Sequence, residues 1–95
     1  MIKEEISTRI QLFIQCQKAD YNKDINFNQC YVIPKKELIV GEEYSGYCRN
    51  SDKARWNGKE FEYERYKFGS YYTDTINHFE DDDGFDLFIP IKVLT

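Results

Sequence analysis

The chain has 95 residues, of which 41% are hydrophobic, 17% aromatic and 32% charged, and its net charge is −4. This composition excludes intrinsic disorder, which requires fewer large apolar residues, and it indicates one folded domain over residues 1–95. The acidic balance argues against a protein that coats nucleic acid through its overall charge. The sequence opens without an apolar signal segment and has no apolar run of about 18 residues, so we expect a cytoplasmic protein.

The cysteines are few and widely spaced. Cys16, Cys30 and Cys48 are odd in number and form no C-x-x-C pair. A disulfide framework or a zinc site needs an even or a clustered set. We therefore expect reduced thiols and no cofactor.

Residues 6–16 show an alternating pattern. Apolar or β-branched residues occupy most even positions, and Phe13 is the one large apolar residue at an odd position. A period of two and the high β propensity predict a strand. The alternative is an amphipathic helix with one face formed by Ile6, Ile10, Phe13 and Ile14.

The next segments are shorter and more polar. Residues 18–28 are rich in Asn and Asp and predict a long loop that can hold one helical turn. Residues 31–33 form a short apolar run that Pro34 closes, because proline lacks the N–H donor of a strand ladder. Residues 44–49 predict a strand in which Gly46 indicates a bulge or a close backbone approach.

Asn57-Gly58 lies between two alternating runs, which is a strong hairpin signal. A two-residue turn at this position places Arg55 opposite Glu60 and Lys53 opposite Glu62, so that opposite charges face each other. The other face of the hairpin then gathers the apolar residues Ala54, Trp56, Phe61 and Tyr63.

Beyond Tyr63 the alternation breaks. A bulge near Glu64-Arg65 would return the following aromatic residues to the core. Gly69-Ser70 predicts a turn, and residues 71–76 predict a further strand.

Residues 87–94 are the most apolar segment and predict a core strand with Pro90 at an edge or a kink. Several short strands, dispersed glycines and no long helical pattern indicate a mainly β fold. We expect a small, strongly curved antiparallel sheet or an SH3-like or OB-like barrel, with a short helix allowed in the first 40 residues.

An acidic run follows the predicted strand 71–76. It does not match the calcium-loop pattern, because the position of Gly84 would put Phe79 and Pro90 at ligand positions. Charge runs of this kind are usually solvated, and a metal site is a further alternative. As a functional hypothesis, the run binds a partner protein through Glu80, Asp81, Asp82, Asp83 and Asp86.

His78 is the single histidine and lies two residues before the acidic run. A histidine and a carboxylate can together act as a general base, but a surface or capping histidine is the expectation. The sequence contains no nucleophile elbow, phosphate-binding loop or H-E-x-x-H motif. We therefore expect no enzymatic activity and no catalytic residues.

Cations and aromatic residues are interleaved between residues 47 and 71. Curved sheets with this pattern hold single-stranded nucleic acid or nucleotides. Several of the cations face glutamates across the predicted hairpin, which weakens the signal. The remaining candidates for a ligand site are Tyr47, Arg49, Arg65, Tyr66 and Lys67.

From Gly41 onward the chain resembles small uncharacterised proteins of bacteria and their phages. The residues that carry the resemblance are Cys48-Arg49-Asn50, Ala54-x-Trp56-Asn57-Gly58-x-x-Phe61-x-Tyr63, Lys67-Phe68-Gly69 and the segment from Glu80 to Phe88. The resemblance brings no catalytic residues. It implies a mobile-element setting, in which small acidic proteins bind and block host machinery.

We therefore expect a non-enzymatic binding protein, encoded by a phage or another mobile element, in the cytoplasm of a bacterial host. It would occlude a host protein such as an antiviral defence factor. The alternative is a module that binds or sequesters nucleic acid or cyclic nucleotides. Neither function involves a membrane, and the oligomeric state is left open.

Overall fold

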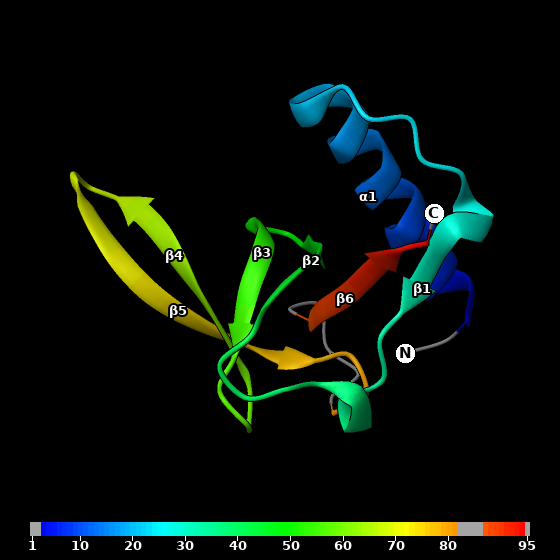
Figure 1. Ribbon diagram of the computed structural model, residues 1–95. Coiled ribbons are helices and arrows are strands. Elements are labelled where there is room, and N and C mark those ends of the chain that lie inside the picture. Colours follow the sequence, from blue (N-terminus) through cyan, green and yellow to red (C-terminus); the bar gives the residue numbers. More distant parts are fainter. Residues whose placement is uncertain (1–2, 82–86, 95) are drawn as a thin grey trace.

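Figure 1 shows the fold in a computed structural model, which describes residues 3–81 and 87–94. The helical elements are α1 (Lys3–Tyr21) and the short 3₁₀ helices η1 (Phe27–Gln29) and η2 (Lys35–Glu37). The strands are β1 (Cys30–Val32), β2 (Glu43–Cys48), β3 (Ser51–Trp56), β4 (Phe61–Lys67), β5 (Ser70–His78) and β6 (Leu87–Val93).

The six strands form one sheet in the order β1-β6-β2-β3-β4-β5. A further parallel pairing joins β5 to β6 at Asn77–Leu87 and His78–Phe88, while the other neighbouring strands are antiparallel. The strands from β2 to β6 therefore close into a ring. This confirms the prediction of a mainly β fold with a strongly curved sheet or small barrel.

Strand β6 lies at the junction of two hydrophobic clusters. Phe88 belongs to the ring cluster, whose other buried members are Cys48, Ala54, Trp56, Phe61, Tyr63 and Ile76. Ile89 and Ile91 belong to the helix cluster, together with Ile10 and Phe13 of α1. Both faces of β6 are thus covered, and this explains why residues 87–91 form a continuous apolar run.

The strand predicted for residues 6–16 is wrong, because this segment lies within the 19-residue helix α1. Ile6, Ile10 and Ile14 are spaced by four residues, a spacing that a period of two and a helical face share. Phe13 breaks the alternation but completes the helical face, where it is buried against β6. Tertiary contact therefore overrides the β propensity of the isoleucines, and the helical alternative is confirmed.

The loop predicted for residues 18–28 is partly helical. Helix α1 continues to Tyr21, and η1 begins at Phe27. Strand β1 then pairs with β6, so the first 40 residues contribute one strand to the sheet that the later strands form. In the described ranges, no helix combines the length and the apolar character that crossing a membrane requires.

Gly46 lies opposite Pro90 where β2 crosses β6. A Cβ at Gly46 would lie 2.1 Å from the Ile89 carbonyl oxygen, which confirms the predicted close backbone approach. The register of β2 on β3 also shifts between Ser45 and Cys48. The edge position considered for Pro90 is wrong, because β6 is an interior strand and Pro90 is buried between β1 and β2.

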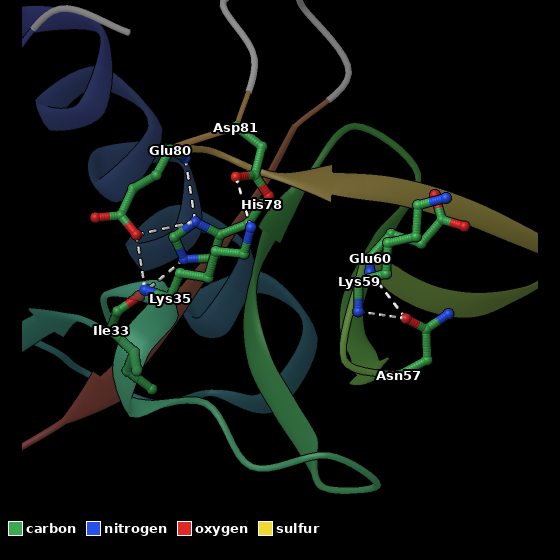
Figure 2. Close-up of polar contacts among 8 residues, drawn as sticks. All are labelled: Ile33, Lys35, Asn57, Lys59, Glu60, His78, Glu80 and Asp81. Atoms are coloured by element: carbon green, nitrogen blue, oxygen red, sulfur yellow. Dashed lines mark hydrogen bonds and ion pairs between the residues drawn. The ribbon is translucent and has the colours of Figure 1, made fainter.

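The predicted hairpin at residues 57 and 58 is confirmed, and its apolar face is buried as expected. Its register is shifted by two residues, with Trp56 opposite Phe61 and Arg55 opposite Glu62. The connection is longer because the Asn57 side-chain oxygen accepts the Lys59 N–H at 2.9 Å and the Glu60 N–H at 2.8 Å (Figure 2). The predicted Arg55–Glu60 and Lys53–Glu62 pairs are therefore wrong.

Strands β4 and β5 form a two-stranded ribbon that extends away from the other strands (Figure 1). Their register is continuous from Phe61–Ile76 to Lys67–Ser70, so the bulge predicted near Glu64-Arg65 is wrong. Beyond Tyr63, none of the β4 residues is buried. The ribbon has left the core at this point, and the aromatic side chains that follow have no interior to which they could return.

Candidate binding surface

The acidic run is described only at its start, since Asp82, Asp83 and Asp86 lie outside the described residues. Glu80 accepts the Lys35 N–H at 2.7 Å, and the Asp81 carboxylate forms an ion pair of 2.8 Å with the Lys35 ammonium group (Figure 2). These contacts join the residues that follow β5 to Lys35, the first residue of η2. The described part of the run thus has a role within the fold, and partner binding by the whole run stays a prediction.

His78 lies directly beside this contact and is fully buried. Its Nδ1 accepts the Glu80 N–H at 3.1 Å, so the proton of the neutral ring is assigned to Nε2, which donates to the Ile33 carbonyl at 3.1 Å. The ring also stacks on Phe61, with a centroid separation of 6.1 Å. Both nitrogens are used inside the fold, so His78 is a buried structural residue; of the expected surface or capping histidine, the surface position is wrong.

Burial lowers the pKa of His78 below its ordinary value of 6.5, because the charged ring would lose its hydration. The Ile33 carbonyl and the carboxylates of Glu80 and Asp81 oppose this shift, while the ammonium group of Lys35 adds to it. The neutral form is therefore the form that fits the fold. A general base would need access to a substrate proton, and a fully buried ring does not provide it.

The five candidates for a ligand site fall into separate places. Tyr47 packs against the helix cluster, and Arg49 is exposed in the turn between β2 and β3. Arg65, Tyr66 and Lys67 follow one another on β4. The last three therefore lie together in the outer half of the ribbon but not on one face, because Tyr66 faces the opposite side from Arg65 and Lys67.

The end of the ribbon carries four exposed aromatic residues, which we call the aromatic tip. Their exposed fractions are 66% for Tyr66, 88% for Phe68, 74% for Tyr71 and 49% for Tyr72. The Tyr66 and Tyr71 rings meet edge to face with centroids 5.0 Å apart, and the Lys67 ammonium group lies 5.3 Å from the centre of the Phe68 ring. Tyr66 and Tyr71 share one face of the ribbon and Tyr72 lies on the other, and exposed aromatic residues at one end of an element are typical of an interaction site.

Phe68 and Gly69 form the turn that joins β4 to β5. Their φ angles are 53° and 79°, and Lys67 pairs with Ser70 on either side of them. A two-residue turn with positive φ at both positions normally carries Asn-Gly, because a bulky side chain is strained in this conformation. A phenylalanine at this position is therefore costly for the hairpin itself.

The charges near the tip largely neutralise one another. Arg65 forms an ion pair of 3.3 Å with Asp74, and the Thr73 hydroxyl donates to the Glu64 carboxylate at 3.1 Å. Arg65, Lys67 and Tyr72 also line a shallow depression of about 410 Å³ on the side of the ribbon. This leaves the surface aromatic and close to neutral.

Three members of the aromatic tip were not among the predicted site residues, namely Phe68, Tyr71 and Tyr72. A signal for them exists in the break of the alternation after Tyr63, which we interpreted as a bulge. None of the three cysteines forms a disulfide. Across residues 3–81 and 87–94, no group of three or more His, Cys, Asp and Glu side chains is placed to hold a metal ion.

Comparison of the chain with protein-family models, with curated proteins and with solved structures finds no match. The functional argument therefore starts from the geometry of the surface.

Proposed function

We propose that the chain is a non-enzymatic binding protein that occludes a partner protein through the aromatic tip. The observation that carries this proposal is the conformation of Phe68, which combines a φ of 53° with a side chain that is 88% exposed. A non-glycine residue in the left-handed region costs about 1–2 kcal/mol. Strain of this kind is typical of functional sites, because the side chain is retained for a purpose other than the fold.

The tip has the composition of an energetic centre in a protein interface. Tyrosine, with tryptophan and arginine, is enriched among the residues that dominate binding, because aromatic rings bury a large area and lose little conformational freedom. The Tyr66–Tyr71 ring pair and the two-residue turn hold the side chains in place before a partner arrives. Such pre-organisation lowers the entropic cost of association.

A protein partner fits the charges better than nucleic acid does. A nucleic-acid site needs several unpaired cations, whereas Arg65 is already paired with Asp74 and Glu64 lies next to it in the chain. The nucleic-acid alternative predicts binding to short oligonucleotides that weakens steeply as salt rises. An absence of binding at low salt would eliminate it.

The resemblance to phage proteins suggests which partner to seek. In that setting the partner is a bacterial host protein, such as an antiviral defence factor, and the protein acts in the host cytoplasm. The acidic run would then contribute to long-range attraction, while the tip supplies the contact area.

The test is affinity capture from bacterial lysate followed by binding measurements with the purified partner. Phe68→Asn is the informative variant, because it removes the ring and relieves the turn at the same time. We expect the partner to bind this variant at least tenfold more weakly than the wild type, a loss of about 1.4 kcal/mol or more.

The matched control is Asp81→Asn, which alters the acidic run and leaves the tip intact. It should retain most of the affinity and lower mainly the association rate. Equal binding by wild type and Phe68→Asn would contradict the proposal.

A further inference from the structure

The outer edge of β5 is the longest unpaired strand edge in the described part of the chain. Ser70–Ile76 pairs with β4 on one side, and only Asn77 and His78 pair with β6 on the other. The edge runs along the ribbon that extends away from the other strands in Figure 1. It therefore presents a row of backbone donors and acceptors to its surroundings.

The hairpin geometry shows which residues of this edge face outward. A two-residue turn is closed by a hydrogen-bonded pair, here Lys67 and Ser70, and hydrogen-bonded pairs alternate along an antiparallel ladder. Tyr72 and Asp74 consequently bond to β4. The N–H and C=O groups of Tyr71, Thr73 and Thr75 point away from it.

The opposite side of the sheet gives the same assignment. The Trp56 N–H donates to the Glu42 carbonyl, and the Trp56 carbonyl accepts the Gly41 N–H. Because these groups alternate in direction along a strand, the N–H and C=O of Arg55 face β4, where Arg55 is paired with Glu62. Because Glu62 uses its groups toward β3, the residue opposite it on β5, Thr75, directs its own groups outward.

The other free strand edges have features that hinder pairing with a further strand, and β5 lacks these features. Strand β1 has only three residues, and the free edge of β4 carries charged side chains. On β3, the Ser51 hydroxyl donates to the Lys53 carbonyl at 2.7 Å and accepts the Lys53 N–H at 3.2 Å. Residues 70–76 of β5 contain no lysine, proline or bulge, and their single charge, Asp74, is paired with Arg65.

The ribbon also lacks support on its faces. None of the residues 64–67 or 70–75 is buried. A two-stranded ribbon is marginally stable in water, and further strands stabilise it. An added strand along β5 would thus support the ribbon and satisfy the open edge together.

We propose that this strand is β5 of a second copy, paired antiparallel about Thr73. The register places Thr73 opposite Thr73, Tyr71 opposite Thr75 and Tyr72 opposite Asp74. It uses the outward groups of Tyr71, Thr73 and Thr75 in both copies, and β-branched residues such as threonine fit well in adjacent strands. A register centred one residue later would place the two Asp74 carboxylates opposite each other, which disfavours it.

The dimer goes beyond the proposed function and does not depend on it. Phe68 lies in the turn and Tyr66 on β4, so both stay outside the paired edge, whereas Tyr71 and Tyr72 of the aromatic tip belong to the paired strand. A failure of the dimer would leave the partner-binding test unaffected, and the reverse also holds.

Analytical ultracentrifugation of the whole chain between about 10 µM and about 1 mM tests the proposal. We expect the mass to rise with concentration from 11.4 kDa toward twice that value. Thr73→Lys places two like charges opposite each other and should weaken the dimer about tenfold, whereas Thr73→Val should leave it unchanged.

The charge-reversed pair makes the register testable. Thr73→Lys mixed with Thr73→Glu should form a heterodimer at concentrations at which each variant alone is monomeric. A wild type that stays at 11.4 kDa throughout would overturn the proposal. Equal dimerisation of wild type and both charged variants would overturn the β5 register.

Discussion

Gly46→Ala is expected to be severely destabilising, because it tests the crossing of β2 and β6 directly. The new methyl group would lie 2.1 Å from the Ile89 carbonyl oxygen and 2.9 Å from the Pro90 Cα. Both obstacles are backbone atoms of a buried strand, so neither can rotate away. The strands would have to separate by about 1 Å to relieve the overlap.

The expected loss in the free energy of unfolding depends on which atoms the new methyl group would overlap. Overpacking in a core costs about 1–3 kcal/mol when side chains can adjust. Since the backbone must move here, the upper end applies, and we expect a loss of about 3 kcal/mol. For a domain of this length, the melting temperature would fall by more than about 10 °C.

Urea unfolding followed by the fluorescence of Trp56 is the appropriate assay, because this single tryptophan is buried in the ring cluster. Ser45→Ala is the matched control, since Ser45 precedes Gly46 on β2 and is exposed. It should change the free energy of unfolding by less than about 0.5 kcal/mol. Similar values for the two variants would refute the close approach of β2 and β6.

Three further changes test the burial of His78 and the two turns. As pH falls below 6.5, the unfolded chain takes up a proton that the folded chain resists at His78. The free energy of unfolding should therefore fall with pH in that window, more steeply in wild type than in His78→Gln. Asn57→Ala removes the acceptor of two backbone N–H groups and should cost about 1–2 kcal/mol in urea unfolding, against no change for Lys59→Ala. Phe68→Asn should raise the melting temperature, because it gains about 1 kcal/mol from relief of the left-handed strain. A neutral or destabilising result would remove the argument from strain at the tip.

Part of the fold follows from local rules and was predictable. The buried face of the β3–β4 hairpin depends only on alternation, and a register shift of two residues preserves that face. Gly46 was recognisable because a glycine within a strand indicates a bulge or a close approach. The core position of residues 87–91 was evident from their apolar run, but their coverage on both faces depends on α1, which was predicted as a strand.

The candidate site was harder to predict for a physical reason. Alternation of apolar and polar residues indicates a strand with one buried face. The outer half of the ribbon has no buried face, so its sequence does not show this alternation. The exposure of Tyr66 and Phe68 thus appeared as a defect in the pattern, whereas it marks the point at which the strands leave the core. Asn57-Gly58 has the residues that are typical of a two-residue hairpin turn. The two-residue turn, however, is formed by Phe68 and Gly69.

The position of β6 in the chain has a consequence for synthesis. Its residues are translated after every other strand, yet β1, β2 and β5 all pair with it and α1 packs against it. Until residues 87–93 have left the ribosome, neither hydrophobic cluster can be completed, because both include side chains of β6. The native structure should therefore form late and in one step, and a nascent chain arrested before Leu87 should remain sensitive to protease.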